Sequence, residues 1–354
     1  MAEQDLPPRL IDVNTPRIAY LDTIRVIACL MVVLVHCPHP HETVTAQTGL
    51  FYGAVSYLCS PCIGLFLMVS GALLFPLKTS GRIFLKRRLG RIVWPLVVWS
   101  AVALVVGCLM GTLTWSAAVG NFLRLPLGCV RGFEHGWYLY VLVGIYLFVP
   151  VIGVWVSAAS RRQLQYFIIL WTVVMSFPYV IAAFGEFGMR ILEPFSGFMG
   201  YMVLGYYLHR YPVRLHTVWQ WGMAAALFVA VAVVLPAIVY LSEIPGYDKF
   251  TQIIYNYRSV STEAMCVAIF VLVHNFNPGW RVWNRMVRGL AVVSFGIYLC
   301  NFIVIRQFFM PYFVAHPMSS VYLEVFVTFA GSLAVSWIIV RLLGLLPFRK
   351  YIIG

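Results

Sequence analysis

The chain has 354 residues, of which 62% are hydrophobic and only 10% are charged, and its formal net charge is +13. Soluble globular proteins carry about 25% charged residues, so this composition excludes a soluble enzyme and, despite the positive charge, a soluble nucleic-acid-binding protein. The mean hydropathy of +0.87 instead predicts a protein built from membrane-spanning helices.

Ten apolar segments have a length that suits a membrane-spanning helix. They are residues 20–37, 53–75, 89–110, 138–157, 164–184, 195–209, 216–240, 260–276, 289–309 and 320–346. They predict an all-α polytopic bundle of about ten transmembrane helices with both termini on one side. No repeat or change of composition marks a second domain, so we divide the chain into a short tail (1–18), one membrane domain (19–346) and a C-terminal tail (347–354).

Basic side chains are distributed unevenly between the two sets of loops. The loops on the side of the N-terminus carry Lys78, Arg82, Lys86, Arg87, Arg88, Arg91, Arg161, Arg162, Arg210, Arg214, Arg281, Arg285, Arg288, Arg349 and Lys350. The opposite loops have fewer bases and most of the acids, which are Glu42, Glu134, Glu186, Glu193, Glu243 and Asp248. Because cytoplasmic loops are enriched in Lys and Arg, this asymmetry predicts that both termini are cytoplasmic.

The first apolar segment reads YLDTIRVIACLMVVLVH and carries polar side chains at both of its ends. Arg25 and His36 are eleven residues apart, so on a helix they return to nearly the same face, about 16 Å apart along the axis. Ionisable groups inside a membrane segment are costly and normally face the bundle interior or a wet cavity. We therefore predict a functional role for His36, whereas Asp22 and Arg25 either share that role or anchor the helix at the headgroups.

The densest charge lies in GRIFLKRRLGRIVWP, residues 81–95. Most of its basic residues are explained as determinants of topology. Arg88 and Arg91 differ because they are three residues apart, share a helical face and lie where the helix enters the membrane. Guanidinium pairs bind phosphate through paired hydrogen bonds, so we predict a phosphorylated cytoplasmic ligand at these two residues.

Two further polar stretches lie at or within later segments. RGFEHGWYLY, residues 131–140, places His135, Trp137 and Tyr138 at the outer start of a helix, where Trp137 is either a site residue or an ordinary interfacial anchor. SFGIYLCN, residues 294–301, aligns Tyr298 and Asn301 in a polar stripe on one helix.

Other residues have competing interpretations. Glu263 lies in an apolar segment, where it either pairs with Arg258 or lines a polar cavity, whereas Glu324 is interpreted as solvated at a helix end. Ser70-Gly71 is interpreted mainly as a place where another backbone approaches closely. Cys59 and Cys62 have C-x-x-C spacing without a second pair, so no metal site is predicted.

Five of these stretches together resemble a known family. YLDTIRVIACLMVVLVH, GLFLMVSGALLF, KRRLGRIVWP, EHGWYLY and SFGIYLCN are similar, in that order, to recurrent motifs of the membrane acyltransferase type 3 family. The resemblance runs from Tyr20 to about residue 345 and is strongest to single-domain bacterial members that O-acetylate surface-polysaccharide precursors. It implies a ten-helix bundle, an acyl-CoA donor and an extracytoplasmic hydroxyl acceptor.

The resemblance also implies roles for individual residues. His36 matches the essential histidine of the first helix, and Arg25 matches an N-terminal arginine. Arg88 and Arg91 match the paired arginines of the third helix, which are associated with CoA. His135, Trp137 and Tyr138 match the motif of the fourth helix. Asn301 departs from the many members that have histidine at this position; because an amide cannot shuttle a proton at neutral pH, a second acid–base role there is not expected.

These implications predict an integral membrane O-acyltransferase of the bacterial inner membrane. It would move an acyl group, acetyl before others, from cytoplasmic acyl-CoA to a hydroxyl of a sugar, glycan or lipid-linked glycan, with His36 as general base or as a covalent acyl carrier. We expect acyl-CoA as co-substrate, membrane lipid as surroundings, and no permanently bound cofactor, metal or nucleic acid. The alternative is a multi-pass transporter of an anionic or lipid-linked substrate.

Overall fold

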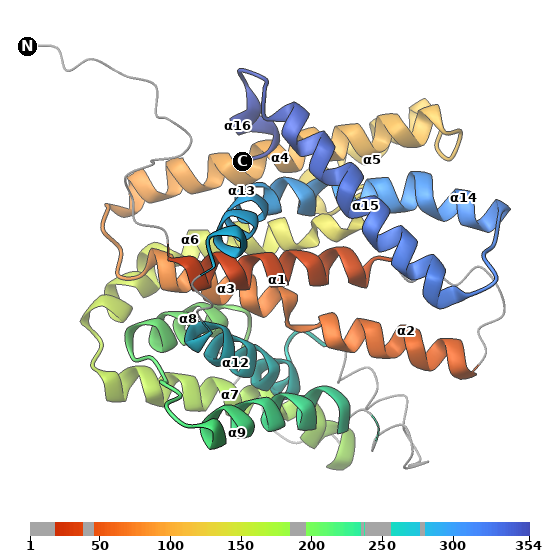
Figure 1. The fold of residues 1–354 in the computed structure, drawn as a ribbon. Coiled ribbons are helices and arrows are strands. Elements are labelled where there is room, and N and C mark those ends of the chain that lie inside the picture. The colour runs from red at the N-terminus through yellow and green to blue at the C-terminus, as the bar shows by residue number, and fades with distance from the viewer. Residues whose placement is uncertain (1–17, 38–45, 185–195, 235–236, 238–255, 277–279) are drawn as a thin grey trace, which may run out of the picture.

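The computed structural model describes residues 18–37, 46–184, 196–234, 237, 256–276 and 280–354, and within them every regular element is a helix (Figure 1). The predicted N-terminal tail, apart from Ile18, lies outside the described residues. Five of the six predicted outer acids also lie outside them, namely Glu42, Glu186, Glu193, Glu243 and Asp248.

Each of the ten predicted apolar segments falls on helix. In chain order these helices are α1 (Ala19–Val35), α2 (Ala46–Cys59) followed by α3 (Pro61–Leu74), α4 (Gly81–Leu109), α6 (Trp137–Ala158), α7 (Arg161–Phe184), α8 (Met199–Arg210), α9 (Val218–Val229), α12 (Val260–Asn275), α13 (Arg281–Val304) and α15 (Val321–Leu343). Within the described ranges, six helices are long and apolar enough to cross a membrane. The all-helical class is thereby confirmed, whereas ten spans with cytoplasmic termini stay a prediction.

Three predicted segments are not single regular helices, and one of them is the seventh, which passes from α9 into the π-helical turn η4 (Ala230–Val234). The second breaks at Ser60 between α2 and α3, because Pro61 has no N–H to donate and suits the first turn of a new helix. The ninth continues beyond α13 through a π-helical turn, η5 (Ile305–Phe309), into α14 (Met310–Ala315).

Shorter elements complete the described chain. They are α5 (Trp115–Leu123), the 3₁₀ turns η1 (Leu125–Leu127) and η2 (Glu134–Gly136), the π-helical turn η4 (Ala230–Val234), and α16 (Arg349–Ile352). The segment predicted as a C-terminal tail contains α16, which packs against α4.

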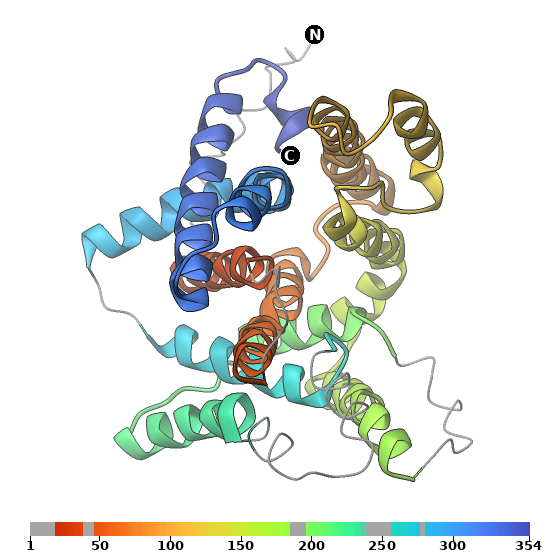
Figure 2. The ribbon, with the colours of Figure 1, turned by 90° about the vertical axis from the view of Figure 1, so that its right-hand side faces the viewer.

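Helix α1 lies in the middle of the bundle and packs against α2, α3, α12, α13 and α15 (Figures 1 and 2). Leu21, Ile24, Ala28 and Val32 recur every three or four residues and are buried, as expected for one face of a helix. The position of α1 explains why polar groups on this helix can meet side chains from several others.

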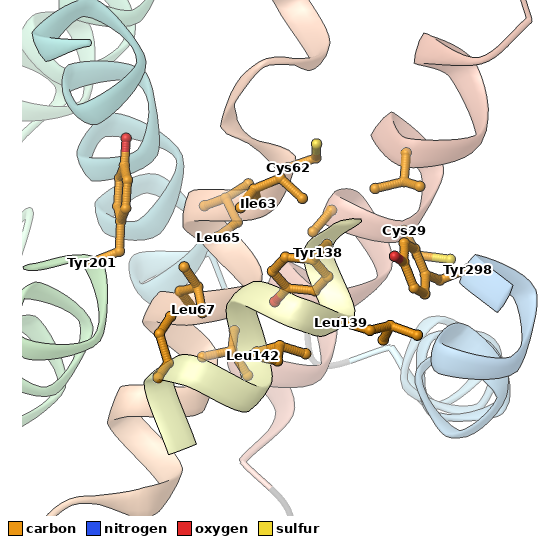
Figure 3. Packing of buried hydrophobic residues seen from close by; sticks show 14 of the residues in the cluster. Cys29, Cys62, Ile63, Leu65, Leu67, Tyr138, Leu139, Leu142, Tyr201 and Tyr298 are labelled. Carbon is orange, nitrogen blue, oxygen red and sulfur yellow. The ribbon is translucent and has the colours of Figure 1, made fainter. Parts of the chain in front are cut away.

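The contact between α3 and α8 depends on two glycines. A Cβ atom on Gly71 would overlap the Met202 carbonyl, and a Cβ atom on Gly205 would overlap the Met68 carbonyl. The two backbones therefore touch, as small residues allow in membrane bundles, and the predicted close approach at Gly71 is confirmed. Figure 3 shows side chains of the core around this contact, contributed by α1, α3, α6, α8 and α13.

One expectation about a charged residue is wrong. Glu324, predicted to be solvated, is only 3% exposed. It lies in the first turn of α15, and α15 packs along both α1 and α13, so that turn is covered rather than open to water.

Candidate functional site

A cavity of about 360 Å³ lies between α1, α3, α4, α6 and α13. We call it the arginine cavity because three guanidinium-bearing residues line it, Arg25 from α1 and Arg88 and Arg91 from α4. Its other polar lining residues are Ser70, Tyr138, Tyr146, Ser294 and Tyr298. The volume falls in the range of small-molecule sites, which are about 300–1,000 Å³.

The arginines reach this cavity for local reasons. Arg88 and Arg91 are three residues apart in the first half of α4, so both side chains leave the same helical face. Arg25 forms an ion pair with Asp22 one turn earlier on α1, at 3.6 Å. In the part of the chain that the structure describes, neither Arg88 nor Arg91 forms an ion pair. Two of the three guanidinium groups of the cavity are therefore without an ion-pair partner among the described residues, and this suits an anionic ligand.

Aromatic side chains also line the cavity. Tyr138, Leu142 and Tyr146 lie four residues apart on one face of α6, and all three line the cavity. The ring of Tyr138 meets that of Tyr298 from α13 edge to face, with the ring centroids 5.8 Å apart; both tyrosines are labelled in Figure 3. The cavity thus combines cationic and buried aromatic side chains in its lining.

Two histidine rings lie next to Tyr298 and Asn301 of α13. Nδ1 of His36, which follows the last residue of α1, is 3.1 Å from Oδ1 of Asn301. Nε2–H of His135 donates to the Tyr298 carbonyl at 3.1 Å, and the Tyr298 hydroxyl donates to the His135 carbonyl at 2.8 Å. The His36 and His135 ring centroids are 5.6 Å apart. We call these two residues the histidine pair.

The histidine pair is packed against one aromatic ring. Phe302 contacts His36 edge to face at 5.0 Å between centroids and stacks on His135 at 4.7 Å. His135 is buried and His36 is half-buried. Nδ1 of His135 is also buried, and among the described residues no group donates a hydrogen bond to it. The pair therefore offers imidazole nitrogens in a mostly dry setting.

Tyr298 connects the two regions. Its ring lines the arginine cavity, while its backbone carbonyl and its hydroxyl are both bonded to His135. Helix α1 makes the same connection along its axis, because Arg25 in its first half and His36 just after its last residue are about 16 Å apart at 1.5 Å per residue. Tyr298 thus links the predicted residues that line the cavity to those of the histidine pair.

Two predicted site residues lie outside this region. Trp137 packs against Tyr257 and Phe198, with ring centroids 5.5 and 6.1 Å apart. Glu263 is buried and accepts a hydrogen bond from the Thr172 hydroxyl at 2.6 Å. No ion pair between Glu263 and Arg258 is formed within the described chain. No group of three or more His, Cys, Asp and Glu that could hold a metal occurs among the described residues.

Sequence reasoning missed several residues of this region. Tyr146 could have been found from its spacing of eight residues from Tyr138 on one helical face. Phe302 carried no signal beyond following Asn301. Gly354 lines the arginine cavity because α16 is held to α4, where the Trp99 indole N–H donates to the Ile352 carbonyl at 2.8 Å. Nothing in the sequence indicated that contact.

Comparison with known proteins places the chain in a family. A model of the acyltransferase 3 family, described as an acyltransferase domain, matches residues 18–341, which is nearly the whole chain. No curated protein and no solved structure matches the chain. The typical reaction of this family is O-acetylation. With its apolar helices and a match of this extent, the chain belongs to the acyltransferase 3 family and is a membrane acyltransferase.

Proposed function

We propose that the protein transfers an acyl group, acetyl in the simplest case, from cytoplasmic acyl-CoA to a hydroxyl of an extracytoplasmic sugar or lipid-linked glycan. The observation that carries this proposal is the connection between the arginine cavity and the histidine pair through Tyr298. In this proposal, the arginine cavity would bind a phosphorylated donor, and the histidine pair would accept a proton from an attacking hydroxyl.

The proposed binding of acyl-CoA depends on the charge and shape of the donor. Acyl-CoA has phosphates at one end and a thioester at the end of a long, narrow arm. Arg25, Arg88 and Arg91 would bind the phosphates, since guanidinium groups pair with phosphate oxygens through two hydrogen bonds. The arm would then extend past the aromatic residues toward the histidine pair, covering the axial distance of about 16 Å between Arg25 and His36.

At the histidine pair, His36 would act as general base. It takes the proton from the acceptor hydroxyl while the hydroxyl oxygen attacks the carbonyl carbon of the thioester. The C–S bond then breaks, and the CoA thiolate takes the proton back from His36, which leaves an ester and free CoA thiol. General-base catalysis of this kind contributes typically about 10²–10⁴-fold to the rate. In a covalent route, His36 would instead carry the acyl group between donor and acceptor.

The test is acyl transfer by the purified protein in liposomes, with radiolabelled acetyl-CoA and glycolipids extracted from bacterial membranes. We expect release of CoA that requires the extract, with the label recovered as an alkali-labile ester on the glycan. One turnover of CoA release without the extract would favour the covalent route. Movement of the glycolipid across the bilayer without CoA release would overturn the proposal in favour of a transporter.

A further inference from the structure

The side-chain amide of Asn301 can be oriented in only one way. Its Nδ2 donates to the Ile297 carbonyl at 2.9 Å and to the Tyr298 carbonyl at 2.8 Å. Both partners are backbone carbonyl oxygens, which accept hydrogen bonds and cannot donate them. Exchanging the oxygen and nitrogen of the amide would place Oδ1 against two other acceptors, so the network fixes Nδ2 on its own helix and Oδ1 toward His36.

This orientation determines which nitrogen of His36 carries the proton. Oδ1 of Asn301 is an acceptor, and Nδ1 of His36 lies 3.1 Å from it, so Nδ1 must be the donor. A neutral imidazole has one N–H and one lone pair, which leaves the lone pair on Nε2. We infer that Asn301 is a positioning residue that holds His36 in the Nδ1–H tautomer and so makes Nε2 the basic atom. The inference rests on the proposed role of His36 as base.

The surroundings of Asn301 strengthen its hold on the orientation of the His36 ring. The side chain is fully buried, so water does not compete for its hydrogen bonds. The Tyr298 carbonyl that accepts from Asn301 also accepts from Nε2–H of His135, which ties both imidazole rings to one turn of α13. His36 itself follows the last residue of α1, so its ring depends on side-chain contacts for its orientation.

The amide of Asn301 is uncharged, and this affects the charge state of His36. The groups that face His36 are the uncharged amide of Asn301, the rings of His135 and Phe302, and Arg306, whose guanidinium lies 5.4 Å from the Phe302 centroid. Among these described neighbours there is no carboxylate that would stabilise a protonated imidazole. An amide orients the ring without adding negative charge, and His36 therefore begins the reaction as a neutral base.

The test is ¹⁵N NMR of the full chain in lipid nanodiscs, labelled at histidine, with the His36 signals assigned by their loss in His36→Gln. For the wild type we expect a protonated Nδ1 and an unprotonated Nε2. In Asn301→Ala we expect a mixture of tautomers and a kcat about 10-fold lower, with the KM for acetyl-CoA unchanged, as for the loss of one hydrogen bond to the reacting group.

A second asparagine serves as a matched control. Asn275 donates Nδ2 to the Val271 and Val213 carbonyls, both at 2.8 Å, but its Oδ1 accepts from the backbone N–H of Leu215 instead of a histidine. Asn275→Ala should therefore leave the His36 tautomer and kcat unchanged.

Two results would overturn the inference. One is a wild-type His36 protonated at Nε2, a measurement that requires no variant of Asn301 to fold. The other is an Asn301→Ala protein that keeps the wild-type tautomer. An active His36→Gln enzyme would instead remove the proposed base, while the NMR result would still decide whether Asn301 sets the tautomer.

Discussion

The arginine cavity and the histidine pair differ in how their side chains are held. Arg88 is half-buried and Arg91 is exposed, and within the described chain neither has an ion-pair partner. In the histidine pair, by contrast, each ring has one nitrogen bonded to an oxygen of α13. Long, mobile cations can adapt to a large flexible anion, whereas two oriented rings can present a single atom to a reacting group.

This difference predicts different kinetic consequences for the two regions. Changes among the arginines should weaken binding of the donor in the ground state and the transition state alike, which raises KM. Changes at the histidine pair should affect only the reaction step, which lowers kcat.

The largest effect is expected for His36→Gln, which keeps a polar side chain but removes the base. We expect kcat to fall about 10²–10⁴-fold, with the KM for acetyl-CoA changed less than about 2-fold. The control is His316→Gln, because His316 is exposed and contacts the Tyr312 carbonyl at the end of α14. A rise in KM equal to the fall in kcat/KM would place His36 in donor binding instead.

The next largest effect is expected for Arg88→Ala/Arg91→Ala. The KM for acetyl-CoA should rise about 10- to 100-fold, because hydrogen bonds to charged groups contribute about 1.5–3 kcal/mol when protected and less when exposed. The control is Arg82→Ala/Lys86→Ala, which removes two exposed charges from the same helix outside the cavity lining. Equal increases in KM for both variants would indicate a general charge effect and contradict a specific donor site.

The arginines of the arginine cavity could largely be predicted from the sequence, because their common helical face depends on local geometry. Spacing of three residues puts Arg88 and Arg91 on one face of any α-helix, and spacing of eleven returns Arg25 and His36 to one face. The apolar length of the segments likewise predicted where the helices lie. These inferences need only helical periodicity and no knowledge of how the helices pack.

The residues of the histidine pair and Asn301 were predicted from the sequence only as separate candidates, without their contacts. His36 and Asn301 are 265 residues apart, and their contact exists because α1 packs along α13. The same packing brings Phe302, a residue that no local pattern marks, into contact with both histidines. For Glu324 the local pattern was misleading. Its position at the start of a helix predicted a solvated side chain, whereas the packing of neighbouring helices buries it.

A smaller effect is expected for Tyr298→Phe, which keeps the ring in the cavity but removes the hydroxyl bonded to the His135 carbonyl. Kcat should fall about 3- to 10-fold, because one buried hydrogen bond contributes about 0.5–1.5 kcal/mol. Tyr201→Phe is the matched control, since its hydroxyl donates to the Tyr257 carbonyl at 2.9 Å, away from the histidine pair. Both variants should lose similar thermal stability, and an equal loss of kcat in both would contradict a specific role for Tyr298.

The smallest effect is expected for Asp22→Asn, and its sign is informative. The Asp22 carboxylate pairs with Arg25 at 3.6 Å and therefore competes with donor phosphates for that guanidinium. Partly exposed pairs of this kind contribute about 0–1 kcal/mol, so removing the charge should lower the KM for acetyl-CoA by about 2- to 3-fold at unchanged kcat. Salt screens exposed charges, so the difference should shrink as ionic strength rises. A higher KM at every salt concentration would mean that Asp22 holds Arg25 in its binding position, and the ion pair would then belong to the donor site.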